Sequence, residues 1–124
     1  MLVPLQEYIE KHPTGDIFIV LHQMGQHGPA YYKRYPASFE TFTPACQSNQ
    51  LETCSGDEIN NAYDNSILYT DFFLSEVIKV LKRNEQKFES AMFYVSDHGE
   101  SLGENGLYLH GLPKWRTGDC AARE

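Results

Sequence analysis

The sequence lacks the long apolar runs and the excess of positive charge that mark several large classes of protein. No apolar stretch approaches the roughly 18–20 residues needed to span a bilayer, and the start, Met1 to Pro4, does not resemble a signal peptide. Ten basic residues against 17 acidic ones give a formal net charge of −7, which argues against a protein that binds nucleic-acid phosphates. We therefore expect a soluble chain that carries no targeting signal of its own.

Cysteine is also scarce, with three residues in 124, at Cys46, Cys54 and Cys120. Cys46 and Cys54 lie in a polar stretch typical of a surface loop, farther apart than the two to four residues usual between structural zinc ligands. A disulfide there would stabilise the fold by roughly 2–3 kcal/mol. Two free thiols in a cytosolic loop fit the composition equally well. Cys120 is left over, which indicates an unusual C-terminus.

The apolar pattern nevertheless predicts an ordered α/β protein. Residues 2–9 have the spacing of a short amphipathic helix, and the continuous apolar runs at 16–22 and 90–96 are typical of buried strands. Ser55 to Glu58 fits a capping box, and the three- and four-residue spacing that follows to residue 81 predicts a long helix. Strand, helix and strand in this order predict a mainly parallel sheet flanked by helices.

Several side chains that could bind a metal follow the two predicted strands. His27 comes after the first strand, and Asp97 and His98 come directly after the second. His110 lies twelve residues beyond His98, across a glycine-rich loop that can fold back. Because ligands gather at the carboxyl ends of parallel strands, we expect these side chains to converge there. Imidazole and carboxylate are zinc ligands, so the pattern is consistent with a zinc site.

Each of these residues also has a simpler interpretation. Histidines after strands are often polar loop residues, and Asp97 could satisfy backbone N–H groups in a turn. Glu100 and Glu104 are expected to be solvated, and the tyrosines at 31, 32 and 35 are expected to pack over loops. From spacing alone, the metal site stays a hypothesis.

A series of motifs makes the hypothesis more specific. The sequence resembles the catalytic domain of bacterial lipid A phosphoethanolamine transferases, including the mobile colistin resistance enzymes, over about residues 2–113. This family belongs to the sulfatase and alkaline phosphatase superfamily. The motifs that carry the resemblance are His22-Gln23-Met24-Gly25-Gln26-His27-Gly28-Pro29, Tyr35-Pro36, Cys46 with Cys54, Asn61-Ala62-Tyr63-Asp64-Asn65, Ser96-Asp97-His98-Gly99-Glu100-Ser101-Leu102-Gly103-Glu104-Asn105-Gly106 and Leu109-His110-Gly111.

The resemblance implies a partial alkaline-phosphatase-like fold and a zinc-dependent reaction. Phosphoethanolamine would pass from phosphatidylethanolamine to lipid A of lipopolysaccharide, through a threonine nucleophile, on the periplasmic side of the inner membrane. Asp97 and His98 would be zinc ligands, His27 and His110 would line the phosphate-binding part or hold a further zinc, and Glu100 would lie at the rim. A periplasmic domain also favours a Cys46–Cys54 disulfide.

The sequence departs from the family in two respects. The membrane-spanning N-terminal region and the first half of the catalytic domain, which holds the threonine, have no counterpart here. We therefore expect this fragment to be inactive alone. Residues 114–124 depart from the family pattern, as a frameshift or truncation would produce, and we place the partial domain at 1–113. The alternatives are a non-catalytic remnant with weak metal binding and a related metal-dependent phosphohydrolase or sulfatase.

Overall fold

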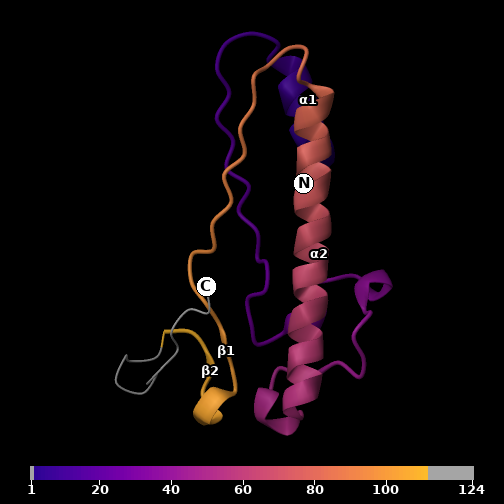
Figure 1. Cartoon of the computed structure of the whole chain (residues 1–124), viewed down its shortest axis with the longest axis vertical. Helices are drawn as coiled ribbons and strands as arrows, with labels where there is room; N and C mark the ends of the chain where they lie inside the picture. Colours follow the sequence, from indigo (N-terminus) through magenta and orange to yellow (C-terminus); the bar gives the residue numbers. More distant parts are fainter. Residues whose placement is uncertain (1, 112–124) are drawn as a thin grey trace. The chain divides into compact units, whose positions relative to one another are not determined.

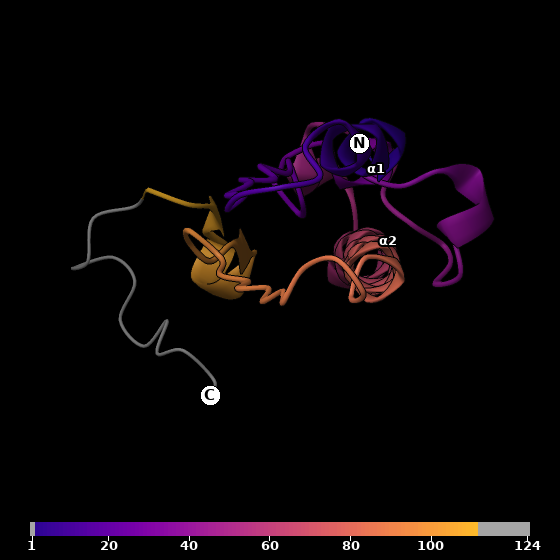
Figure 2. The same ribbon diagram turned by 90° about the horizontal axis from the view of Figure 1, so that it is seen from above.

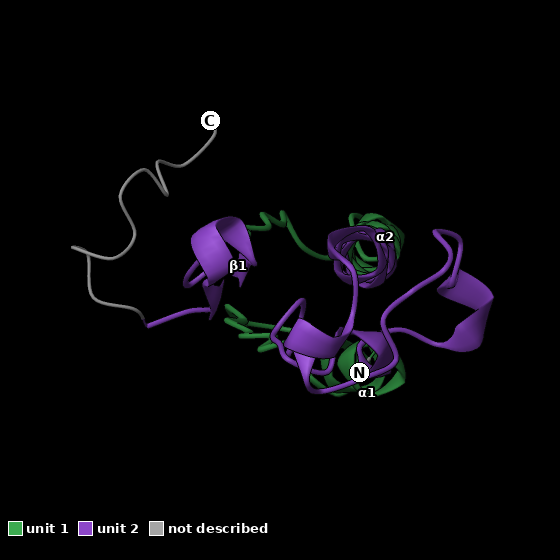
Figure 3. Ribbon diagram, turned by 90° about the horizontal axis from the view of Figure 1, so that it is seen from below, with its two compact units in different colours: residues 1–23, 70–94 green, residues 24–69, 95–124 purple. Residues whose placement is uncertain are grey.

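The computed structural model describes residues 2–111, which form two compact units (Figures 1 and 3). Within this range, the first unit comprises residues 2–23 and 70–94, and the second comprises residues 24–69 and 95–111. The helix α2 (Gly56–Arg83) contributes to both. No helix among the described residues is both long and apolar enough to cross a membrane. The predicted boundary at residue 113 and the segment 114–124 lie outside the described residues.

The first unit is built around α1 (Leu2–Lys11), as the amphipathic pattern predicts. Figures 1 and 2 show α1 beside the C-terminal part of α2, where Leu5 and Ile9 pack against Val80. Burial of apolar side chains of this size contributes about 1.5–3 kcal/mol each. Asn84, buried near the end of α2, donates to the side-chain oxygen of Gln6 at 3.0 Å. This partly buried bond links α1 to the residue that follows α2.

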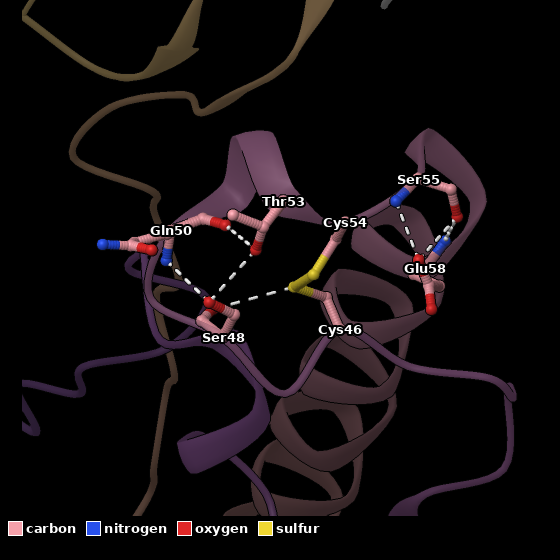
Figure 4. Close-up of a disulfide and its surroundings, with 7 residues drawn as sticks. All are labelled: Cys46, Ser48, Gln50, Thr53, Cys54, Ser55 and Glu58. Carbon is pink, nitrogen blue, oxygen red and sulfur yellow. Dashed lines mark hydrogen bonds between the residues drawn. A yellow bond between two sulfur atoms is a disulfide. The ribbon is translucent and has the colours of Figure 1, made fainter.

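The N-terminus of α2 is fixed by the capping box that the sequence predicts (Figure 4). The Ser55 hydroxyl accepts from the Glu58 N–H at 3.3 Å, and the Glu58 carboxylate accepts from the Ser55 N–H at 2.7 Å. The bond from the Ser55 backbone holds the pKa of Glu58 below its ordinary value, so the cap is a carboxylate at neutral pH. The prediction of a long helix from this point is confirmed.

Two asparagines on α2 hold the preceding loop in the second unit. Asn65 is fully buried, and its side-chain oxygen accepts from the N–H groups of Thr41 and Phe42 at 2.9 and 2.8 Å. One turn earlier, Asn61 donates to the carbonyl of Pro44 at 2.8 Å. Between residues 31 and 53 the chain forms only short 3₁₀ turns, at Tyr31–Lys33, Ala37–Phe39 and Leu51–Thr53. The asparagines therefore satisfy backbone groups that no regular element pairs.

A disulfide joins Cys46 to Cys54 and closes the loop that enters α2 (Figure 4). The expected pairing is confirmed. Cys46 is buried within the core of the second unit, which also contains Tyr31, Leu51, Ile59 and Ala62. The disulfide therefore stabilises a loop that already packs against the first turns of the helix.

The described residues contain one small sheet, which is antiparallel. Strands β1 (Ser101–Leu102) and β2 (Tyr108–Leu109) pair with Ser101 opposite Leu109, and a 3₁₀ turn at Glu104–Gly106 joins them. This hairpin folds the glycine-rich loop back on itself, as the sequence suggested.

The predicted strands at residues 16–22 and 90–96 are not strands in this structure, so the parallel sheet is not confirmed. Neither segment makes a backbone hydrogen bond within residues 2–111. Phe18 and Phe93 are 91% and 89% exposed. An apolar run favours a strand only where a neighbour satisfies its N–H and C=O groups, and the described residues supply none.

Candidate metal centre

Three histidines from three separate loops of the second unit come together in space. His27, His98 and His110 each offer a ring nitrogen, and these nitrogens lie within 4.8 Å of one another. The rings of His98 and His110 are stacked with their centroids 3.9 Å apart, and the His27 ring meets the His110 ring edge-on at 4.8 Å. We call His27, His98 and His110 the three-histidine cluster. The expected convergence of these residues is present even though the predicted strands are not.

His27 is held by a tight turn. Its backbone N–H donates to the carbonyl of Met24 at 2.9 Å, and its own carbonyl accepts from Arg34 Nε at 2.7 Å. The His27 ring nitrogen Nδ1 lies 2.7 Å from the carbonyl oxygen of Gly28. The ring therefore has a defined orientation before any ligand is present.

Asp97 and His98 lie on the loop that follows residues 90–96. The Ser96 hydroxyl donates to the His98 carbonyl at 2.6 Å, and His98 Nδ1 lies 2.9 Å from the Gly99 carbonyl oxygen. The Asp97 side chain is 81% exposed, and its Oδ1 lies 3.8 Å from His98 Nε2. Asp97 therefore lies next to His98, while the ring nitrogens that come together are those of His27, His98 and His110.

His110 directly follows β2 and is positioned by the hairpin. Gly103 has φ +118°, a left-handed conformation that favours glycine, and it starts the turn between the strands. Within the turn, Glu104 Oε2 accepts from the Ser101 hydroxyl at 2.7 Å and from the Leu102 N–H at 2.8 Å. The Ser101 bond is the main reason why the pKa of Glu104 is lowered. Glu104 therefore stabilises the hairpin and is not a candidate ligand.

The hydrogen bonds define which ring nitrogens are available. A carbonyl oxygen only accepts, so Nδ1 carries the proton in His27 and His98 and Nε2 is left as the basic nitrogen. In His110, Nδ1 faces the carboxylate of Glu100 at 3.6 Å. His27 and His98 therefore present Nε2 for binding, as is usual in metal sites where the other ring nitrogen of a histidine donates to a carbonyl oxygen.

These residues fit a zinc ion by the chemistry of their donors. Two ligands of one tetrahedral zinc lie about 3.3 Å apart, because each bond is about 2.0–2.1 Å long. The 4.8 Å limit and the 3.8 Å Asp97–His98 distance are somewhat larger, so rotations of exposed side chains would bring the donors to zinc. The donors lie on loops, which are more mobile than helices.

Glu100 was expected to lie at the rim of the site and to be solvated. The structure shows it buried instead. Its side chain is only 4% exposed, and its Oε1 accepts from the Gly28 N–H at 3.0 Å. The physical reason is that Gly28 leaves an unpaired N–H in the loop after His27, and the carboxylate turns inward to bind it.

Tyr31 was predicted only to pack over a loop, and it does pack there, 1% exposed, in the core of the second unit. Sequence reasoning missed that its hydroxyl packs against Gly28, the residue after His27. The signal was Gly28: a Cβ at this position would lie 2.8 Å from the Tyr31 oxygen and 2.5 Å from Leu109 Cδ2. Glycine is common where another group packs closely against the backbone, as Tyr31 and Leu109 do here.

With this geometry in place, the comparison with known proteins is decisive. The family model for sulfatases matches residues 1–122. The chain belongs to the sulfatase family. A solved structure, the C-terminal periplasmic domain of phosphoethanolamine transferase EptC from Campylobacter jejuni, is 54% identical and superposes with a TM-score of 0.85 over 90% of this chain and 36% of that one. These likenesses show that the chain is part of an α/β domain of the alkaline-phosphatase type.

Two further relatives agree. Phosphatidylethanolamine transferase Mcr-2 from Escherichia coli is 54% identical over 113 residues, which are 91% of this chain and 21% of that protein. The soluble domain of lipooligosaccharide phosphoethanolamine transferase A from Neisseria meningitidis is 45% identical, with a TM-score of 0.85 over 92% of this chain and 34% of that one. The resemblance found in the motifs is confirmed. The chain spans about a fifth of the length of the curated relatives that it matches.

Proposed function

We propose that this sequence forms the histidine-bearing part of the active site of a zinc-dependent phosphoethanolamine transferase. The donor would be phosphatidylethanolamine, as in the name of the Mcr-2 relative, and the acceptor lipid A of lipopolysaccharide, as in the name of another relative, Kdo(2)-lipid A phosphoethanolamine 7''-transferase from Escherichia coli. The observation that carries the proposal is the convergence of the three-histidine cluster in a sulfatase-family chain, with Asp97 next to His98 in the sequence.

In this proposal, Asp97 and His98 are ligands of the catalytic zinc. Their Oδ1 and Nε2 atoms are 3.8 Å apart, and both are accessible from solvent. When bound, zinc neutralises phosphoryl oxygens and activates a nucleophile near neutral pH. The protein's own contribution is to hold His98 Nε2 free of its proton through the bond from Nδ1 to Gly99.

His27 and His110 would act on the phosphoryl group beside that zinc. Their rings are in edge-on contact at 4.8 Å, so both can face one tetrahedral phosphate. Each can bind a second zinc through Nε2, or can donate to a phosphoryl oxygen once Nε2 is protonated. Both roles place and neutralise the transferred group, which is most of what catalysis of phosphoryl transfer requires.

The disulfide and the exposed apolar segments bear on the location of the protein and on the predicted parallel sheet. A disulfide such as Cys46–Cys54 persists in oxidising compartments, which supports a periplasmic domain at the inner membrane. The exposed apolar segments at 16–22 and 90–96 would be strands of the parallel sheet in a complete sulfatase-family domain. The 54% identity to a solved periplasmic domain of which this chain spans 36% supports that view.

Zinc titration by calorimetry tests the metal site directly. We expect the wild-type chain to bind zinc, and Asp97→Ala and His98→Ala each to weaken binding at least tenfold. His12→Ala is the matched control, since His12 lies at the end of α1, outside the cluster. Equal binding by all four proteins would contradict the assignment.

A chimaera tests the transfer reaction. Residues 2–111 would replace the corresponding segment of the Escherichia coli relative, and phosphoethanolamine on lipid A would be measured by mass spectrometry. We expect the chimaera to modify lipid A, and the same chimaera with Asp97→Ala or His98→Ala to lose modification. A folded, membrane-inserted chimaera without transfer activity would refute the proposal. Hydrolysis of phosphate or sulfate esters in its place would favour the hydrolase alternative.

A further inference from the structure

A buried carboxylate lies beside His110 of the three-histidine cluster. Glu100 Oε1 accepts from the Gly28 N–H at 3.0 Å and lies 3.6 Å from His110 Nδ1. The second oxygen, Oε2, is buried and has no hydrogen-bond partner among the described residues. A buried carboxylate oxygen without a partner is costly, so a donor is expected close to it.

The Tyr31 hydroxyl is the one other buried side-chain polar group without a hydrogen-bond partner in the described part of the chain. It packs against Gly28, where a Cβ would lie only 2.8 Å from its oxygen. Burial, and then the nearby charge of Glu100, raise the pKa of Tyr31. The phenol therefore keeps its proton and remains a donor, facing a carboxylate that lacks one.

We propose that Tyr31 and Glu100 form a buried phenol–carboxylate pair that positions the histidines above it. Glu100 receives the Tyr31 O–H on one side and the Gly28 N–H and His110 Nδ1–H on the other. It thereby fixes His110 with its proton on Nδ1 and its Nε2 free. Through Gly28, whose carbonyl lies 2.7 Å from His27 Nδ1, the same carboxylate restrains His27. Glu100 is a positioning residue and touches no substrate.

The chemistry of the site requires a carboxylate rather than an amide. The three groups around it, an O–H, a backbone N–H and a ring N–H, are all donors. A carboxylate accepts all three, whereas the NH₂ group of a glutamine would face at least one of them. Glu100→Gln therefore keeps the size of the side chain and removes one acceptor. This makes it a sharper variant than Glu100→Ala, which would leave a cavity.

Histidine NMR on the metal-free chain tests the pair without any metal. Long-range ¹H–¹⁵N correlation of ¹⁵N-labelled protein at pH about 8.5, where imidazoles are neutral, reports which nitrogen carries the proton. We expect the Nδ1–H tautomer for His110 in the wild type and a shift towards the Nε2–H tautomer in Glu100→Gln. Tyr31→Phe should shift it in the same direction, by less. Glu52→Gln, an exposed carboxylate of the same unit, should leave it unchanged.

A wild-type His110 protonated on Nε2 would overturn the proposal, and so would an unchanged tautomer in a folded Glu100→Gln protein. If Glu100→Gln does not fold, the tautomer of His110 in Tyr31→Phe is the test, and an unchanged tautomer overturns the proposal. Zinc binding is the second readout, and we expect it to weaken about 10–100-fold in Glu100→Gln. The functional role of the Tyr31–Glu100 pair rests on the proposed zinc site. The NMR test of the pair does not, because it uses the metal-free chain. Absence of zinc binding by the wild type would refute the site, whereas an unchanged tautomer would refute the pair alone.

Discussion

Gly28 is the residue on which the geometry beneath the three-histidine cluster depends most directly. Its N–H binds Glu100, its carbonyl binds His27, and its missing side chain makes room for Tyr31 and Leu109. Its φ is not positive, so the requirement for glycine is steric. A single small residue thus connects His27, the buried carboxylate of Glu100 and the core of the unit.

Gly28→Ala should therefore disturb the site and the core together. The added Cβ would lie 2.5 Å from Leu109 Cδ2, so the surrounding side chains must move, at a cost of about 1–3 kcal/mol. We expect a lower free energy of unfolding in urea and weaker zinc binding in calorimetry. Gly56→Ala is the control, because a Cβ at Gly56 would enter open space. Equal free energies of unfolding for the two variants would show that the side chains around Gly28 move aside without loss of stability.

The residues of the site were largely predictable, but one supporting side chain was not. His27 and His98 were expected to converge because each follows a predicted strand of one parallel sheet, and His110 because a glycine-rich loop could fold back. Glu100 was misplaced at the rim, because its burial depends on Gly28 and Tyr31, which approach it from 72 and 69 residues away in sequence. Local patterns contain no information on such a contact.

At the scale of elements, the loop into α2 is stabilised by two devices, the capping box and the Cys46–Cys54 disulfide. The disulfide links a core residue to the residue just before the cap, so it restrains the chain where the helix begins. Its effect on folding can be separated from that of the cap because only the disulfide responds to reductant.

Reduction of this disulfide should lower the free energy of unfolding by roughly 2–3 kcal/mol, since a short loop regains its conformational freedom in the unfolded chain. Urea denaturation with and without dithiothreitol measures the difference. The double variant Cys46→Ser with Cys54→Ser should be destabilised and insensitive to reductant, while Cys120→Ser should behave as the wild type. A wild-type chain that is indifferent to reductant would contradict the expectation.

Helices were predicted well and strands poorly, for a physical reason. The start of α2 is encoded within four residues, from Ser55 to Glu58, and its apolar spacing continues through the helix. A strand depends on a neighbouring strand that can be far away in sequence. The runs at 16–22 and 90–96 therefore indicate a high β propensity but do not identify the strand that each would pair with. The two-residue strands β1 and β2 were missed because they are too short to show an alternating pattern.

At the scale of the whole molecule, the balance between acidic and apolar surface determines behaviour in solution. The net charge of −7 favours solubility. Against this, Phe18, Val20, Phe93 and Val95 are all at least 69% exposed on segments without backbone hydrogen bonds in the described chain. Exposed apolar segments with free backbone groups are typical sites of intermolecular pairing.

We expect the chain to associate with itself as its concentration rises, and the double variant Phe18→Lys with Phe93→Lys to do so at least several-fold less. Sedimentation velocity at several concentrations provides the measurement. Asn49→Lys with Asn60→Lys changes the charge equally at two exposed polar positions and serves as the control. If the control suppresses association as strongly as the phenylalanine variant does, charge rather than apolar surface is responsible.

The register of the β1–β2 hairpin sets the position of His110 in the three-histidine cluster. Pairing of Ser101 with Leu109 determines where His110 emerges, whatever the number of residues in the turn. A slip of one residue would turn the histidine to the opposite face, and a slip of two would carry it about 7 Å along the strand. Relatives could therefore differ in the length of the turn and keep their chemistry, provided that this one pairing is preserved.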